Sequence, residues 1–130
     1  MVPAPLISIV DDDTSVREAL KALVKSVGYA VEVFPSATEF LSSSHLGATS
    51  CLIADVQMPL MTGVELYSRL IEAGHLIPTI LITAYPDHDT IARILKDGAV
   101  CYLSKPFDDA VLLDCVHSAL ERGRPTGAPP

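Results

Sequence analysis

The stretch that decides the fold is CLIADVQMP, at residues 51–59. Its first four residues have the length and composition of a buried strand, which ends in a lone carboxylate, Asp55, followed at once by a loop. Doubly wound sheets place their chemistry in this way, at the carboxyl ends of their strands. The stretch therefore predicts a parallel sheet with Asp55 at its functional edge.

Three other apolar runs also end at polar side chains. They are LISIV at 6–10 before Asp11 and Asp12, TILI at 79–82 before Thr83, and VCYLS at 100–104 before Lys105. The carboxyl ends of parallel strands share one edge of a sheet, so we expect these side chains to meet Asp55. Each residue alone is an ordinary strand end; their joint placement predicts one site.

Helical segments alternate with the strands. Capping residues and apolar side chains three and four positions apart predict helices at about 14–27, 36–41, 62–73, 87–97 and 108–122, and residues 30–34 predict a further strand. This alternation implies parallel pairing, right-handed crossovers and helices on both sheet faces. The predicted fold class is α/β: a single doubly wound (βα)5 domain whose five-stranded parallel sheet has the order 2-1-3-4-5.

Length and charge exclude several classes of protein. A chain of 130 residues, 49% of them hydrophobic, suffices for one compact core. Nine Lys and Arg against sixteen Asp and Glu give a net charge of -7, so we expect no direct nucleic acid binding by this chain. The apolar runs are far shorter than the roughly 20 residues that cross a bilayer, so no membrane association is expected. The start of the sequence lacks the pattern of a secretory signal, which predicts a cytoplasmic protein.

The domain organisation follows from the same patterns. We expect an N-terminal extension at 1–5, one domain at 6–122, and a linker or C-terminal tail at 123–130, where Pro and Gly are frequent. Cys51, Cys101 and Cys115 are odd in number and lie in apolar patterns, which favours packing over a metal or redox role.

The acidic residues predict a divalent cation. Asp11, Asp12 and Asp55 in one crevice would repel one another unless a cation joined them. Carboxylates, a backbone carbonyl and waters suit Mg²⁺, with Mn²⁺ as a substitute. Beside a metal and Lys105, the Asp55 carboxylate could attack phosphorus and form an acyl phosphate, with Thr83 bonding a phosphoryl oxygen.

Together these motifs resemble the receiver domain of two-component response regulators, which has a CheY-like fold. The resemblance covers residues 6–122 and is strongest to the FixJ-type subgroup. The matching pieces are IVDDD at 9–13, DVQMP at 55–59, TGVEL at 62–66, TA at 83–84 and KPF at 105–107.

The resemblance implies a role for each site residue. Asp55 would be the phosphoacceptor and a metal ligand, and Asp11 and Asp12 would bind Mg²⁺ with the backbone carbonyl of Gln57. Thr83 and Lys105 would assist the transfer. Thr83 and Tyr102 would be the switch residues, although Tyr102 is equally consistent with a half-buried strand aromatic. The bond between Lys105 and Pro106 would be cis.

It also implies partners. A sensor histidine kinase would supply the phosphoryl group, and the protein would be a signalling phosphoacceptor that assists its own phosphorylation and dephosphorylation. Phosphorylation would change the face formed by the fourth helix, fifth strand and fifth helix, which would control homodimerisation or a transcriptional output domain. We expect no helix-turn-helix output domain within these 130 residues.

Two residues depart from the family pattern. Pro86 stiffens the loop that must move on phosphorylation, so it bears on the amplitude or speed of switching. The Gln57 side chain could help or hinder the water that hydrolyses the acyl phosphate.

Two alternatives stay open at this stage. One is a phosphatase of the haloacid-dehalogenase class with Asp11 as nucleophile, since residues 11–13 supply its Asp-x-Asp pattern. The other is a receiver-like interaction module that never takes phosphate.

Overall fold

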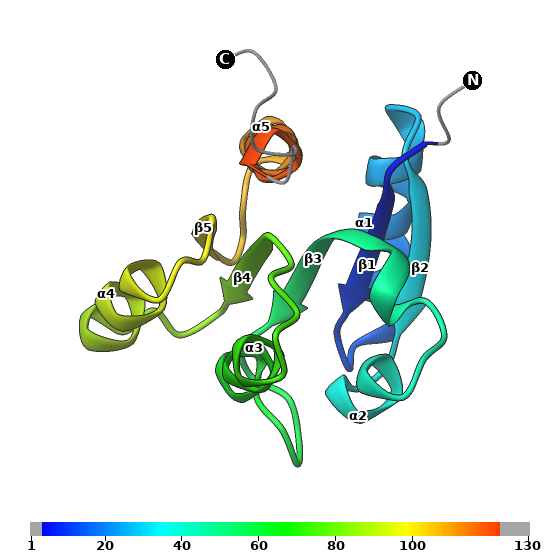
Figure 1. Cartoon of the computed structure of the whole chain (residues 1–130). Helices are drawn as coiled ribbons and strands as arrows, with labels where there is room; N and C mark the ends of the chain where they lie inside the picture. Colours follow the sequence, from blue (N-terminus) through cyan, green and yellow to red (C-terminus); the bar gives the residue numbers. More distant parts are fainter. Residues whose placement is uncertain (1–3, 123–130) are drawn as a thin grey trace.

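The computed structural model describes residues 4–122. Within this range, parallel strands form one sheet in the order β2-β1-β3-β4-β5 (Figure 1). The strands are β1 (Leu6–Val10), β2 (Ala30–Phe34), β3 (Thr49–Asp55), β4 (Thr79–Thr83) and β5 (Cys101–Ser104). The helices are α1 (Thr14–Ser26), α2 (Ala37–Leu41), α3 (Gly63–Glu72), α4 (His88–Lys96) and α5 (Asp109–Arg122), and a short 3₁₀ helix covers Leu46–Ala48.

The predicted fold class and strand order are confirmed. The largest difference is the start of β3, which begins at Thr49 rather than at residue 51. Pairing explains the earlier start, because Leu6 of β1 lies opposite Thr49 and the hydroxyls of Ser8 and Thr49 are 2.7 Å apart. The predicted extension at 1–5 falls mostly, and the predicted tail at 123–130 wholly, outside the described residues.

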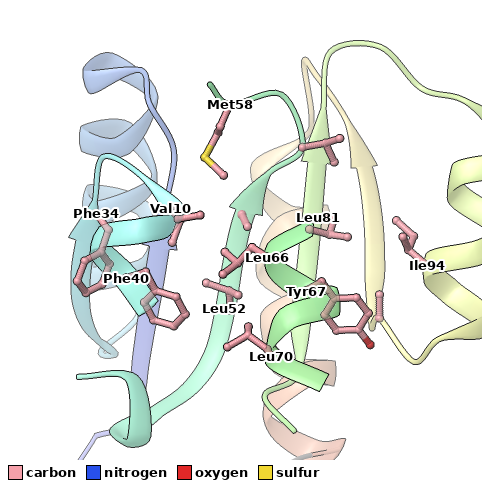
Figure 2. Packing of buried hydrophobic residues seen from close by; sticks show 14 residues of the cluster. Val10, Phe34, Phe40, Leu52, Met58, Leu66, Tyr67, Leu70, Leu81 and Ile94 are labelled. Atoms are coloured by element: carbon pink, nitrogen blue, oxygen red, sulfur yellow. The ribbon is translucent and has the colours of Figure 1, made fainter. Parts of the chain in front are cut away.

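The helices cover both faces of the sheet, as the alternation predicted. Successive strand residues point to opposite faces. Ile7 and Ile9 of β1 therefore belong to the apolar cluster on the side of α1 and α5, whereas Val10 belongs to the cluster on the side of α2, α3 and α4. Figure 2 shows this second cluster, in which Phe34 and Phe40 meet edge to face with their ring centroids 5.2 Å apart. These two apolar layers hold the strand ends in fixed positions.

Helix caps fix the loops that follow the acidic strand ends. The Asp13 carboxylate accepts a hydrogen bond from the backbone N–H of Val16, at 3.1 Å, and so begins α1 directly after β1. Thr62 and Glu65 form the predicted capping box at the start of α3, with bonds of 3.0 and 3.1 Å. Both helices thus start close to the edge that carries the acids.

The start of α3 lies against the end of β3, and only glycine fits there. The backbone N–H of Gly63 donates to the Val56 carbonyl at 3.0 Å. A Cβ atom on Gly63 would overlap the carbonyl oxygen of Asp55 and would also crowd Val56. The absence of a side chain at Gly63 therefore helps to fix the backbone that presents Asp55.

Gly63→Ala is expected to lower the free energy of unfolding by about 1–3 kcal/mol, because β3 and α3 must separate to admit the new methyl group. Urea denaturation followed by circular dichroism measures the change. Gly47→Ala is the matched control, since a Cβ there meets nothing within 4 Å, and it should change stability by less than about 0.5 kcal/mol. Equal stability of the two variants would contradict the close approach.

Candidate functional site

Three carboxylates meet at the carboxyl edge of the sheet. The side-chain oxygens of Asp11, Asp12 and Asp55 lie within 4.8 Å of one another. Asp11 and Asp55 are buried, with 2% and 6% of their surface exposed, whereas Asp12 is exposed. The structure thus brings together the acids that follow β1 and end β3, as the sequence predicted.

Lys105 joins the two buried acids. Its Nζ atom lies 3.5 Å from Asp11 Oδ2 and 3.5 Å from Asp55 Oδ2. The backbone N–H of Lys105 donates to the Thr83 carbonyl at 2.7 Å, which continues the pairing of β4 and β5 up to the lysine. The bond between Lys105 and Pro106 is cis, as the resemblance implied. One ammonium group therefore lies between the two buried carboxylates.

Hydrogen bonds from the adjoining loops hold the acids in place. Asp11 Oδ1 accepts from the backbone N–H of Asp13 at 2.9 Å, and Asp55 Oδ1 accepts from that of Gln57 at 3.3 Å. Arg17 donates to the carbonyl oxygen of Asp11 at 2.6 Å. This contact of Arg17 was not predictable from the sequence, because a basic residue early in a helix carries no sign of its partner.

The electrostatic balance disfavours ionisation of both buried acids. Burial is the main cause that raises the pKa of Asp55; the charge of Asp11 raises it further, and Lys105 and the Gln57 N–H act against both. Burial also raises the pKa of Asp11, against the hydrogen bond from Asp13 and the charge of Lys105. A cation placed among the carboxylates would offset the cost of burying these two negative charges close together.

The donor set fits a hard divalent cation. Three carboxylates that converge from two strand ends are the ligands that Mg²⁺ prefers, and Asp12 is open to solvent, so bound waters could complete the coordination. Within residues 4–122, no second group of His, Cys, Asp and Glu side chains converges in this way. Burial raises the pKa of both Cys51 and Cys115 to about 12, which agrees with a packing role for these thiols.

Thr83 is buried at the end of β4 and is bonded to Gln57. Its hydroxyl donates to Gln57 Oε1 at 2.7 Å and accepts from the backbone N–H of Tyr85 at 3.0 Å. The N–H of Ala84 donates to the same Gln57 oxygen at 3.3 Å. The sequence predicted the position of Thr83 but gave no sign that the Gln57 amide would bind it.

The remaining predicted residues lie near this edge in different roles. Tyr102 of β5 is partly buried and packs on the α2–α4 side of the sheet. Asp13 lies outside the three-carboxylate group and caps α1. This position argues against the phosphatase alternative, whose Asp-x-Asp pattern includes Asp13. Pro86 lies in the exposed loop before α4.

Comparison with known proteins assigns the family. The response regulator receiver domain family matches residues 7–117. Response regulator protein TodT of Pseudomonas putida is 42% identical over 118 residues, which cover 91% of this chain and 52% of TodT. Transcriptional regulatory protein FixJ of Azorhizobium caulinodans is 36% identical over 121 residues, 93% of this chain and 57% of FixJ.

A solved structure agrees with these sequence matches. The crystal structure of FixJ-N superposes with a TM-score of 0.81 at 34% identity and covers 92% of this chain and 96% of that one. The fold and the edge site define a receiver domain. The chain belongs to the response regulator receiver domain family, and FixJ is among the regulators that it is similar to. It spans just over half the length of these curated relatives. None of the helices in the described part of the chain could cross a membrane.

Asp55→Asn is expected to raise the free energy of unfolding of the metal-free protein at neutral pH. The substitution removes a buried charge that Asp11 repels, while Lys105 keeps Asp11 as a partner. Urea denaturation in the presence of a chelator measures the gain. Glu18→Gln, which removes one charge from the exposed side of α1, is the control and should change stability by less than about 0.5 kcal/mol.

The gain should shrink as the solution is acidified. The pKa of Asp55 is higher in the folded protein than its ordinary value of 3.8, so the protonated form favours the fold. That stabilisation is complete below the ordinary value and is lost as the pH rises through the raised pKa. The wild type therefore approaches Asp55→Asn in stability as the pH falls toward 3.8. A difference that widened on acidification would contradict the raised pKa.

Proposed function

We propose that this chain is the phosphoacceptor domain of a cytoplasmic two-component response regulator, and that a sensor histidine kinase transfers a phosphoryl group to Asp55. One observation carries the proposal. A buried carboxylate at the end of the central strand meets two further carboxylates and a lysine that come from the ends of β1 and β5. Thr83, at the end of β4, is linked to this group through Gln57. The Gln57 side chain accepts a hydrogen bond from the Thr83 hydroxyl, and the Gln57 backbone N–H donates to Asp55.

The chain supplies the nucleophile and the groups around it. An Asp55 carboxylate oxygen attacks phosphorus, and the phosphorus–nitrogen bond of the donor phosphohistidine breaks as the new oxygen–phosphorus bond forms. Lys105 lies 3.5 Å from the Asp55 carboxylate and favours the ionised form that attacks.

Asp11, Asp12, Asp55 and the backbone carbonyl of Gln57 would hold Mg²⁺, or Mn²⁺ in its place. When bound, the ion neutralises charge on the transferring phosphoryl group. The same residues would serve the return reaction with water, so the domain would assist both its phosphorylation and its dephosphorylation.

The signal would reach the α4–β5–α5 face. An added phosphoryl group carries about -2 of charge and would draw the Thr83 hydroxyl and the N–H of Ala84 toward Asp55. Movement of Thr83 would leave room for Tyr102 to turn inward and so change this face.

Leu95 of α4 and Val111 of α5 are 44% and 45% exposed on these elements, which supports a contact with a second copy or with an output domain. The relative FixJ is named a transcriptional regulatory protein, and we propose a transcriptional output for the longer regulator that would contain this domain.

Acetyl phosphate with Mg²⁺ is expected to label the wild-type chain, and Asp55→Asn should reduce labelling to background because the attacking carboxylate is gone. Mass spectrometry should locate a hydroxylamine-sensitive phosphoryl group on Asp55, and a chelator should prevent its formation. Glu18→Gln should be labelled like the wild type. Labelling of Asp11 would instead support the phosphatase alternative, and a wild type without labelling or Mg²⁺ binding would support the interaction module.

Beryllofluoride with Mg²⁺, a mimic of the phosphoryl group, is expected to promote self-association through the α4–β5–α5 face. Analytical ultracentrifugation should then show a higher weight-average mass. Leu95→Glu should prevent the increase, since it places a charge in the proposed contact. Leu76→Glu is the matched control, because Leu76 is 82% exposed but lies in the loop between α3 and β4. An unchanged mass for the wild type, or an equal effect of both variants, would contradict this contact.

A further inference from the structure

The Gln57 side chain accepts hydrogen bonds from two donors at the end of β4. Its Oε1 atom accepts from the Thr83 hydroxyl at 2.7 Å and from the Ala84 N–H at 3.3 Å. The Tyr85 N–H donates to the Thr83 hydroxyl oxygen at 3.0 Å. Since that bond takes up a lone pair of the hydroxyl, the Thr83 proton is directed at Gln57.

The same residue also contacts the acceptor carboxylate. The backbone N–H of Gln57 donates to Asp55 Oδ1 at 3.3 Å. β3 and β4 are neighbours, and Asp55 lies opposite Ile82, one residue before Thr83. Gln57 therefore bridges Asp55 and the end of β4, with its main chain on one side and its amide oxygen on the other.

A phosphoryl group on Asp55 would bring negatively charged oxygens close to these donors. A charged oxygen forms shorter and stronger hydrogen bonds than a neutral amide oxygen does. The Thr83 hydroxyl has a single proton and cannot donate to both acceptors. The phosphoryl oxygen and the Gln57 amide oxygen must therefore compete for it.

We propose that Gln57 is an internal competitor of the phosphoryl group, a positioning residue that holds Thr83 and Ala84 in the unphosphorylated arrangement until a phosphoryl oxygen displaces its amide. This inference rests on the proposed function. The Gln57 side chain is exposed, so water can solvate the displaced amide. Gln57 then lowers the affinity of the switch for phosphate without blocking the reaction at Asp55.

Beryllofluoride affinity in the presence of Mg²⁺ tests the competition. Fluorine NMR titration should show Gln57→Met binding the mimic roughly 3- to 10-fold more tightly than the wild type, because about one net hydrogen bond to the competitor is lost. Gln57→Glu should bind more weakly than the wild type, since a carboxylate holds the Thr83 proton more strongly and repels the mimic.

The double variant separates competition from a general effect of the side chain. In the Thr83→Ala background the contested hydroxyl is absent and only the longer bond from the Ala84 N–H remains to be displaced, so Gln57→Met should raise the affinity by less than it does in the wild-type background. In the wild type, the side-chain amide resonances of Gln57 should shift toward those of a solvated glutamine when beryllofluoride binds. This second measurement needs no substitution.

The outcomes distinguish this inference from the proposed function. Equal affinities of the wild type and Gln57→Met, an undiminished gain in the Thr83→Ala background, or unmoved Gln57 amide resonances in the bound state would overturn the competition while leaving phosphorylation of Asp55 intact. Failure of the wild type to bind beryllofluoride at all would overturn the proposed function, and this inference with it.

Discussion

The structure depends on one electrostatic constraint: two buried carboxylates, Asp11 and Asp55, share a single lysine. The ends of β1 and β3 force them together, because those strands are neighbours in the sheet. Burial and mutual repulsion raise the pKa of Asp55, and Lys105 only partly offsets this effect. The apolar layers on the two faces of the sheet hold this unfavourable arrangement in place. The site is therefore arranged to accept a cation, which would relieve the repulsion between these acids.

The site around the two buried carboxylates has a rigid part and a part that can move. The acids and Lys105 follow strands whose backbones are paired, and Gly63 lets α3 close against β3. The Thr83 side chain and the start of the loop after it are instead held by hydrogen bonds to Gln57, an exposed side chain. The donors of these hydrogen bonds can change to a stronger acceptor without disturbing the core. The proposed phosphoryl transfer would thus take place on the rigid part of the site, and the proposed signal would pass through the hydrogen bonds that can exchange.

The sequence could predict the strand-end residues, because apolar periodicity locates strands and parallel topology brings their carboxyl ends to one edge. It could not predict the early start of β3, which depends on the contact between Ser8 and Thr49. Nor could it predict the bond from Thr83 to Gln57, because the path of the loop and the side-chain rotamers decide which polar groups meet across it. Contacts set by topology were therefore predictable, and contacts set by loop conformation were not.

The most direct test is a crystal structure of this chain with Mg²⁺ and beryllofluoride. The account predicts one metal ion held by Asp11, Asp12 and Asp55, beryllofluoride on the Asp55 carboxylate, and the Thr83 hydroxyl bonded to a fluorine rather than to Gln57. A structure in which Asp11 and Asp55 turned into separate pockets, or in which the metal bound away from both, would contradict it.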